Sequence, residues 1–354
     1  MKILLLINWH IEYGQHQDDS YLPSDYCYDK KFWFFKYFKE PCEVDVVDTR
    51  SIRWIEKFEK QYLRIYIMQT LRVLPKLKKY DLIISHGTTS GIFLDLLREI
   101  FKLKTPPHIT VDISSFHKAS ESGLIYNLCR KASKKIDYLI YHTSMQEKYF
   151  KKHFPWLNSK SKFIPFGIDK NYWEKKEYKK LNCTEPFILC VGYRKRDWKT
   201  LIKAYQKSSQ KYKMYLIGND NIENNQKNIK ILPFMKLDEL MQYICDSYCC
   251  ILPLEYMPYS FGQMTLLQEM IMGKAVITAK VPSVMDYNSD GLIWYKAGDE
   301  KDLLKKLEWI FDHPVEIKKL GNINKSTVRN KYSAEQMAEE FEKICLELIK
   351  NKEY

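Results

Sequence analysis

The 354-residue chain is predicted to form an α/β protein of two doubly wound domains, each built on a parallel sheet. Short apolar runs alternate with helical stretches through the first half, and a second series of such runs follows a charged segment without periodicity, "EKKEYKKLNCTEP". The chain is also too long for one hydrophobic core, and 45% hydrophobic residues are enough for two. We expect a first domain at residues 1–168, a linker at 169–185, a second domain at 186–330 and a last helix at 331–354.

The first domain is expected to begin with a buried strand. The run "KILLLI" is too short for a secretory signal and has no small-residue cleavage site, so it fits a strand of a parallel sheet covered on both faces. Similar runs predict the other strands, and amphipathic stretches predict the helices. The strands are expected at residues 3–7, 44–48, 82–85, 108–111 and 138–142, and the helices at 25–39, 52–77, 92–101 and 124–133.

The second domain is expected to repeat the pattern of strand and helix. Its apolar runs each precede a turn, and past Asp302 the sequence is helical to the end. These runs are "PFILCVGY", "KMYLIGND", "IKILPF", "CCILPL" and "KAVITA".

The stretch "SFGQMTLLQEMIMGKAVI" predicts a helix over residues 261–272, with Ser260 as its N-cap and Gly273 as its stop. Helical periodicity places the leucines and Met270 toward the core and Glu269 away from it, with Gln268 on the border. A border position suits a residue that contacts a ligand at the edge of a crevice, but an ordinary amphipathic helix has the same pattern.

Charge and cysteine usage limit the class of protein. The formal net charge of +13 indicates attraction to nucleic acid, anionic lipid or a phosphorylated substrate, or a lysine-rich solvated surface. Nine cysteines without metal-like or disulfide-like spacing indicate a reduced, cytosolic setting. No segment has the roughly 20 apolar residues that cross a bilayer. We therefore expect a cytoplasmic protein that is soluble or peripheral on the inner face of the membrane.

Four segments, in order and spacing, resemble the donor-binding half of the GT-B glycosyltransferases, and glycosyltransferase family 4 in particular. They are "PFILCVGYRKRDWKTLIKAY", "IKILPFMKLDEL", "SFGQMTLLQEMIMGKAVIT" and "YNSDGLIWYKAGD". The amino half is similar mainly in "YDLIISHGTTSG", "PPHITVDISSF" and "FIPFGID". The resemblance implies a GT-B fold of two Rossmann-like domains facing each other across a crevice, and a retaining transfer from a nucleotide sugar.

The resemblance assigns the helix at 261–272 to the donor. Its amino end is expected to face the diphosphate with the backbone N–H groups near Gly262, Gln263 and Met264, where the helix dipole favours an anion. Gln268 takes the place of the family's ribose-binding acid, with Glu269 next to it; an amide can also bond ribose hydroxyls.

One departure from the family pattern concerns the sugar. The family's other glutamate, eight positions earlier, is Ser260 here, and Glu255 in the preceding loop is a candidate substitute. Sugar recognition, and retention as against inversion of the anomeric configuration, are therefore not assigned.

The basic loop "GYRKRDWKT" is expected to neutralise the leaving diphosphate. Tyr193 stands at the family's arginine position and Arg196 at its lysine position, with Arg194 and Lys199 as alternates; a solvated basic loop is the other interpretation. Phe234, after the strand "IKIL", is expected either at the nucleobase or in the core.

The amino half carries candidates on the acceptor side. Gly14 lies where the family has a glycine turn, and Asp112 and His117 follow the strand "HITVD", from which related enzymes reach the donor sugar or acceptor hydroxyl. Asp112 also fits a helix cap. His86 is placed similarly.

Neither a metal nor another cofactor is expected, because no D-x-D motif follows a strand and no G-x-G-x-x-G turn is present. The aromatic and basic segment 30–41, "KKFWFFKYFKEP", fits either a membrane-surface helix or a core helix with snorkelling lysines. With "RKASKKIDY" and "YFKKHFPWLNSKSK" it makes the amino half the expected carrier of the charge surplus.

The predicted function is therefore a GT-B glycosyltransferase that uses a nucleotide sugar and a saccharide or lipid-linked acceptor in cell-envelope or polysaccharide biosynthesis. The alternatives are a GT-B sugar-nucleotide epimerase and a non-enzymatic basic protein that binds nucleic acid. The sequence contains no recognised nucleic-acid module, which disfavours the last.

Overall fold

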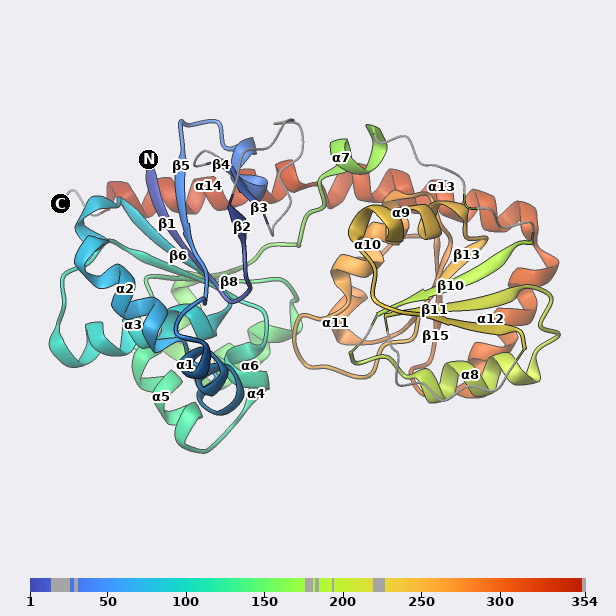
Figure 1. Ribbon diagram of the computed structural model, residues 1–354, viewed down its shortest axis with the longest axis horizontal. Coiled ribbons are helices and arrows are strands. Elements are labelled where there is room, and N and C mark those ends of the chain that lie inside the picture. The colour runs from blue at the N-terminus through green and yellow to red at the C-terminus, as the bar shows by residue number, and fades with distance from the viewer. Residues whose placement is uncertain are drawn as a thin grey trace. The chain divides into compact units, whose positions relative to one another are not determined.

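The chain forms two compact units in the computed structural model (Figure 1). The structure describes residues 1–13, 26–28, 31–175, 181, 185–192, 194–218 and 227–351. Unit 1 consists of Met1–Pro165, Pro258–Ser260 and Ala334–Tyr354, and unit 2 of Phe166–Met257 and Phe261–Ser333. The last helix therefore packs with the first unit, although it follows the second in sequence.

Unit 1 is built on a six-stranded parallel sheet with the order β5-β1-β6-β7-β8-β9. Its central strands are continuous apolar runs covered on both faces, as the sequence predicted. The strands are β1 Lys2–Ile7, β5 Glu43–Val47, β6 Leu82–His86, β7 His108–Asp112, β8 Tyr138–Tyr141 and β9 Ser161–Phe163. A small second sheet joins β2 Glu12–Tyr13, β3 Tyr26–Tyr28 and β4 Lys31–Phe32.

Helices follow most strands of this unit and cover its sheet (Figure 1). They are η1 Trp33–Tyr37, α1 Arg53–Phe58, η2 Glu59–Leu63, α2 Ile67–Val73, η3 Leu74–Lys79, α3 Thr88–Phe101, α4 Ser115–Ala119, α5 Leu124–Ala132, η4 Ser133–Lys135, α6 Met145–His153, η5 Pro155–Lys160 and α14 Ala334–Lys350. The chain crosses back to this unit through α14, which packs against η1.

The helix predicted over residues 25–39 is wrong. Residues 25, 29 and 30 lie outside the described residues, and the described part contains two short strands and the 3-10 helix η1, because bulky aromatic residues favour extended structure and Phe32 is extended. Phe34 and Phe35 are buried, and the Phe34 ring lies 4.9 Å from that of Phe341 on α14. This part of the segment therefore belongs to the core, which was one of its two interpretations.

The helix predicted over residues 52–77 is divided. Arg64 has a left-handed backbone (φ 52°) that ends η2, and Pro75 lies in the first turn of the 3-10 helix η3, which follows α2. A left-handed residue cannot continue a right-handed helix, so the stretch becomes two helical segments.

Unit 2 is built on a second six-stranded parallel sheet, with the order β12-β11-β10-β13-β14-β15. The strands are β10 Phe187–Val191, β11 Lys213–Ile217, β12 Ile229–Leu232, β13 Cys249–Leu252, β14 Val276–Ala279 and β15 Leu292–Tyr295. The helices are α7 Lys170–Lys175, α8 Trp198–Lys207, α9 Leu237–Asp246, α10 Gln263–Ile271, α11 Pro282–Met285, α12 Glu300–Asp312 and α13 Pro314–Lys331. Each apolar run of the second half that the sequence singled out contains one of these strands.

The segment expected as a linker, residues 169–185, begins with a short helix in the part that the structure describes. Residues 170–175 form α7, and Trp173 is buried in the core of unit 2 because its large apolar ring packs beside the sheet helices.

Candidate functional site

The strand order of unit 2 defines where a ligand can bind. In chain order it is 3-2-1-4-5-6, the arrangement of a Rossmann sheet, and the order reverses between β10 and β13. The loops after these two strands run to opposite sides, which leaves a crevice at the carboxyl ends of the strands. Arg196 lies in the first of these loops and the start of α10 follows the second.

Arg196 is held at this switch point by its backbone and its guanidinium. Its backbone forms an antiparallel bridge with Leu254, in the loop after β13. The Arg196 side chain is 6% exposed, and its Nε donates to the carbonyl of Val191 at 3.0 Å. Its Nη2 donates to Thr265 Oγ1, in the first turn of α10, at 3.3 Å. The cation therefore lies beside the start of that helix, as the resemblance implied.

The helix α10 begins two residues later than the sequence predicted. Gly262, with φ 86°, is the N-cap residue, whereas the sequence predicted Ser260. A side chain at Gly262 would collide with Leu254, since an added Cβ would lie 2.8 Å from its methyl groups. Because glycine has no side chain to cap the first N–H groups, the helix dipole and these donors are available to an anion.

The residues near this helix end differ in exposure. Gln263 is buried, Met264 is exposed, and Gln268 is half-buried, as its border position predicted. Ser260 is buried. Glu255 is exposed and forms an ion pair of 3.4 Å with Lys195, so it already has a cationic partner.

The prediction that Glu269 points away from the core is wrong. Its side chain is fully buried (0% exposed), because it lies toward the sheet, close enough to Cys190 on β10 and to Cys249 and Cys250 on β13 to interact with them electrostatically. Within the described chain, neither carboxylate oxygen of Glu269 has a hydrogen-bond partner. Burial raises the pKa of this carboxyl well above its ordinary range, although the Arg196 cation lowers it in part.

The other predicted donor residues lie on the surface of unit 2. Arg194 and Lys199 are exposed, and the carbonyl of Arg194 accepts a hydrogen bond of 3.2 Å from Arg196 Nη1. Phe234 is exposed after β12, so the core interpretation of this ring is wrong. Tyr193 lies outside the described residues.

Unit 1 has its own switch point, between β1 and β6, because its order in chain terms is 2-1-3-4-5-6. Trp9 follows β1 and His86 ends β6, with their ring centroids 5.2 Å apart. Trp33 lies against the same imidazole, also at 5.2 Å. Sequence reasoning noted His86 but missed both tryptophans, because only the fold brings residues 9 and 33 to the end of β6.

His86 is a buried, neutral ring. Burial and the neighbouring His142 lower the pKa of His86 to about 3. The pKa of His142 is itself lowered by burial to about 4. At neutral pH both imidazoles at this edge of unit 1 are therefore uncharged.

Asp112 is fully buried at the end of β7, where it serves as a local cap. Its carboxylate accepts the hydroxyl of Thr88 and the backbone N–H of Phe116, the latter at 3.0 Å. Burial raises the pKa of Asp112 to about 6, although these hydrogen bonds lower the pKa in part. This is the capping role that a position after a strand also predicted. Gly14 and the side chain of His117 lie outside the described residues.

A buried hydrogen-bonded chain in unit 1 resembles a hydrolase triad but is enclosed. His108 Nε2 lies 2.9 Å from Ser85 Oγ, and its Nδ1 lies 2.9 Å from Asp95. Arg98 donates to Asp95 and to Asp137 at 2.9 and 2.8 Å. Because Ser85, His108 and Asp95 are all 0% exposed, this network ties α3 to the sheet and cannot reach a substrate.

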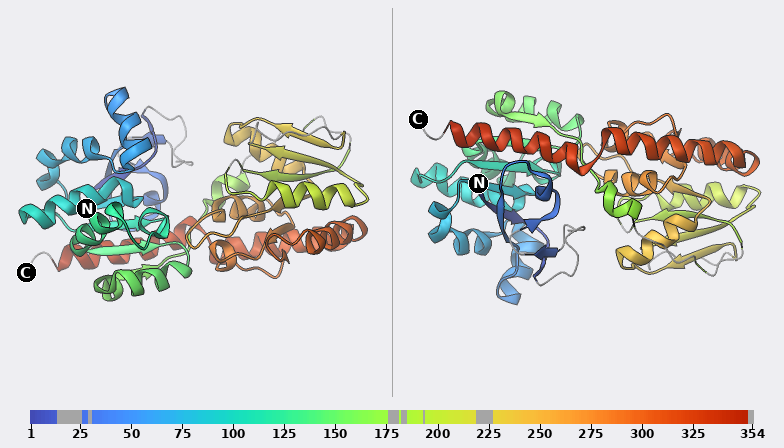
Figure 2. Two further views of the ribbon diagram at one scale, coloured as in Figure 1. Left: turned by 90° about the horizontal axis from the view of Figure 1, so that it is seen from below. Right: turned by 90° about the horizontal axis from the view of Figure 1, so that it is seen from above.

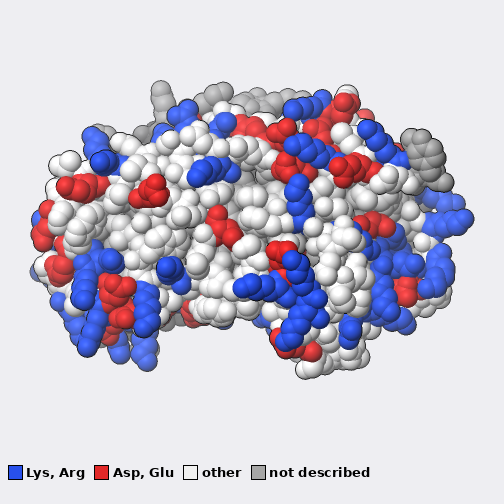
Figure 3. Space-filling view, turned by 180° about the vertical axis from the view of Figure 1, so that it is seen from behind, with Lys and Arg blue, Asp and Glu red and all other residues white. Residues whose placement is uncertain are grey.

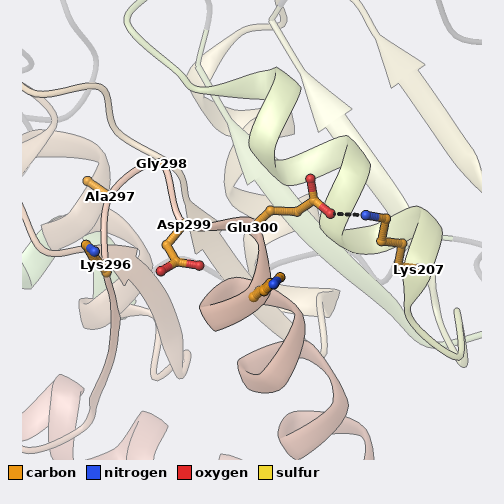
Figure 4. A pocket seen from close by; sticks show the side chains of 7 residues that line it. Lys207, Lys296, Ala297, Gly298, Asp299 and Glu300 are labelled. Carbon is orange, nitrogen blue, oxygen red and sulfur yellow. Dashed lines mark ion pairs between the residues drawn. The ribbon is translucent and has the colours of Figure 1, made fainter.

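A shallow hollow of about 550 Å³ lies where α8 ends and α12 begins (Figure 4). Its lining includes Lys207 and Glu300, which form an ion pair of 2.5 Å, and Asp299, which caps α12 by accepting the N–H of Asp302. These polar groups already have partners, and Arg196 does not line the hollow. We therefore place the candidate site at the switch point.

In the part of the chain that the structure describes, no cluster of three or more His, Cys, Asp or Glu side chains could hold a metal ion. The same residues contain no helix long and apolar enough to span a bilayer.

Comparison with solved structures shows the GT-B fold. Sucrose-phosphate synthase from Thermosynechococcus elongatus is similar with a TM-score of 0.72 at 14% identity, over 99% of this chain and 100% of that one. HepE of Anabaena in complex with UDP is similar with a TM-score of 0.66 at 13% identity, over 96% and 98%. A glycosyltransferase from Rickettsia africae is similar with a TM-score of 0.70 at 13% identity, over 99% of each chain.

A family model narrows the class for unit 2. Residues 185–313 match the model described as glycosyl transferases group 1, and this segment contains Arg196 and α10. No curated protein matches the chain. The predicted resemblance to GT-B glycosyltransferases is confirmed, while the subgroup, family 4, stays a prediction.

Proposed function

We propose that this protein transfers a glycosyl group from a nucleoside diphosphate sugar to a saccharide or lipid-linked acceptor, with retention of the anomeric configuration. We place this reaction in cell-envelope or polysaccharide assembly on the cytoplasmic face of the membrane. The family-model match of residues 185–313 and the GT-B fold support the transfer, as does the complex of HepE with UDP.

The observation that carries the proposal is the position of Arg196. Its guanidinium bonds Thr265 in the first turn of α10, so a fixed cation and a helix amino end meet at one switch point. A diphosphate placed there gains from both the dipole and the cation. As the glycosidic bond breaks, negative charge develops on the leaving nucleoside diphosphate, and these groups stabilise it without reorganising.

Gln268 is proposed to bond the ribose, because it is half-buried on α10 and its amide can both donate to and accept from hydroxyls. Gly262 permits a close approach of the backbone to the phosphates, since no side chain fits beside Leu254. We further propose that no metal ion is needed, so a chelator leaves turnover unchanged.

The test is nucleotide binding by calorimetry, followed by transfer. Binding of UDP, GDP or ADP by the wild-type protein is expected, and Arg196→Ala should weaken it by about 1.5 to 3 kcal/mol through loss of a charge-assisted contact. Lys203→Ala is the matched control, because this lysine is exposed on α8 and its loss also removes one cation. Absence of binding to all three nucleotides by the wild type would contradict the proposal.

A turnover assay distinguishes a glycosyltransferase from a sugar-nucleotide epimerase. A glycosyltransferase consumes the nucleotide sugar only when an acceptor is present, apart from slow hydrolysis, whereas an epimerase converts it without one. Product analysis with and without acceptor fractions distinguishes the two. Strongly salt-dependent oligonucleotide binding without nucleotide-sugar binding would instead favour the nucleic-acid alternative.

A further inference from the structure

The helical segment formed by α1 and η2, residues 53–63, turns large aromatic side chains to solvent. Trp54, Phe58 and Tyr62 are 70%, 48% and 71% exposed. They follow one another at intervals of four residues, so they lie on one helical face, and the rings of Phe58 and Tyr62 are 5.5 Å apart. A contiguous exposed aromatic face on an otherwise well-packed unit indicates an interaction surface.

On this segment the basic side chains are exposed and the acidic side chains are engaged in hydrogen bonds. Arg53, Lys57 and Lys60 are exposed, as is Arg64 at its end. The acidic residues are engaged on the inner side instead. Glu59 is buried and accepts the N–H of Met68 at 2.9 Å, and Glu56 is hydrogen-bonded to His10. The outer surface therefore combines aromatic rings with cations and carries no free carboxylate of this segment.

We propose that the α1–η2 surface, defined by Trp54, Phe58 and Tyr62 with the flanking cations, binds the headgroup region of an anionic phospholipid bilayer. Aromatic rings insert at the boundary between headgroups and acyl chains, while Lys and Arg meet the lipid phosphates. The segment is far shorter than the roughly 20 residues needed to span a bilayer, so it lies on the surface. In both views of Figure 2, α1 projects at the outer edge of unit 1.

The distribution of charge along the chain agrees with an anionic partner. Residues 1–168 contain 27 of the 57 Lys and Arg residues but only 18 of the 44 Asp and Glu residues, so they carry +9 of the net charge of +13. Basic side chains are spread with acidic ones over the face in Figure 3, so the total charge alone does not select a binding face. The exposed aromatic rings select α1 and η2, because on these two elements the rings lie next to exposed basic side chains.

The position of the segment connects it to the switch point of unit 1. Glu56 is bonded to His10, which follows Trp9 in the loop after β1. The segment proposed to bind the bilayer is therefore attached, through its inner side, to the loop that carries Trp9. If the proposed glycosyl transfer stands, this arrangement favours an acceptor carried by the same bilayer; this consequence rests on the proposed function, whereas lipid binding does not.

Co-sedimentation with vesicles tests the proposal. The wild-type protein should sediment with vesicles of phosphatidylcholine and phosphatidylglycerol, more than with phosphatidylcholine alone, and less in about 1 M salt, where the Debye length is about 3 Å. Trp54→Ala/Phe58→Ala/Tyr62→Ala should lower the partition coefficient at least about tenfold, and Lys57→Glu/Lys60→Glu should remove the preference for the anionic lipid.

Matched controls come from other exposed positions. Phe101→Ala removes an aromatic ring that is 66% exposed in the same unit, and Lys318→Glu/Lys319→Glu changes the charge equally on α13. Both controls should bind vesicles as the wild type does. Equal loss in these controls, or wild-type binding by the triple variant, would overturn the proposal.

A spectroscopic measurement localises the contact. Brominated anionic lipid should quench Trp54, so the quenching of total tryptophan emission should be smaller in Trp54→Phe than in the wild type. Identical quenching contradicts insertion of this ring. Light scattering without lipid tests whether the same surface binds a second copy of the protein. A dimer in the wild type that the triple variant loses, together with no vesicle binding, would show self-association instead of lipid binding.

Nucleotide binding distinguishes the failures of the two proposals. The triple variant should keep the nucleotide-induced thermal shift of the wild type, since α1 and η2 belong to unit 1 and the donor site to unit 2. Lipid binding without nucleotide binding would refute the proposed function alone. Nucleotide binding without lipid binding would refute the α1–η2 surface alone.

Discussion

Replacing Glu269 with glutamine should change how the stability of the protein depends on pH. The carboxyl is fully buried, and within the described residues neither of its oxygens has a hydrogen-bond partner. Burial raises its pKa well above the ordinary range, and Arg196 only partly opposes this effect. The folded protein therefore keeps the proton at pH values where the unfolded chain has lost it.

The sign and size of the effect follow from this difference in proton binding. The unfolded carboxyl titrates near 4.5. Above that pH the folded state binds more protons than the unfolded state, so the free energy of unfolding decreases by about 1.36 kcal/mol per pH unit. The stabilisation is complete below the unfolded pKa and is lost progressively as the pH rises toward and through the folded pKa. Glutamine does not titrate, so Glu269→Gln lacks this contribution.

Urea unfolding at about pH 5 and about pH 6 measures the contribution. The free energy of unfolding of the wild type, relative to Glu269→Gln, should fall by about 1.2 kcal/mol between these two conditions, because the unfolded carboxyl is only partly ionised at pH 5. Glu255→Gln removes an exposed carboxylate of the same unit and controls for the loss of one acid. Glu269→Met should be at least as stable as the wild type at neutral pH, because it removes a buried polar group without partners. Parallel stabilities of wild type and Glu269→Gln across this range would refute the reasoning.

Three further changes probe other parts of the two units. Gln268→Ala should weaken nucleotide-sugar binding by about 0.5 to 1.5 kcal/mol in calorimetry and leave the melting temperature nearly unchanged, because the side chain is half-buried; a large loss of stability with unchanged affinity would show a core role. Asp95→Asn should destabilise the protein by about 3 to 5 kcal/mol in urea unfolding, because Arg98 and His108 lose a buried anionic partner, and a loss below about 1 kcal/mol would contradict this. His86→Gln should reduce the loss of stability as the pH falls below about 6.5, because the wild-type ring, with its pKa lowered to about 3, stays neutral while the unfolded chain binds a proton; an unchanged acid limb would contradict this.

The sheets could be predicted from the sequence because their strands are covered on both faces. A strand such as β10 is a continuous apolar run, which periodicity identifies without knowledge of its neighbours. The two series of runs and the break between them were enough to predict two α/β units. The strand orders, which locate the switch points, depend on contacts between distant segments and could not be predicted from periodicity.

Helix faces were less predictable because periodicity assumes one solvated side. On α10 that assumption placed Glu269 in solvent, whereas it is buried near Cys190 on β10 and Cys250 on β13. The segment 25–39 shows the converse, because its aromatic residues suited a helix face in the sequence but pack into short strands and η1. In both cases tertiary contacts overrode a local pattern.

The functional residues, too, could be predicted only in part from the sequence. Arg196 was predicted through the family resemblance, and the structure places it beside α10. The aromatic face of α1 has a spacing that the sequence displays, with Trp54 and Phe58 four residues apart. Whether this face is exposed or packed against another element depends on the tertiary structure, which the local sequence does not show.

The chemistry of the two switch points assigns each unit a different part of the proposed reaction. In unit 2 a fixed cation, Arg196, lies beside a helix amino end capped only by Gly262, which suits a diphosphate. In unit 1 the corresponding edge carries His86 between two tryptophan rings, and this imidazole is uncharged at neutral pH because its pKa is lowered to about 3. Uncharged aromatic rings suit the apolar face of a sugar better than they suit phosphate. The cation and helix end of unit 2 therefore favour binding of the nucleotide there, and the uncharged rings of unit 1 favour binding of the saccharide acceptor.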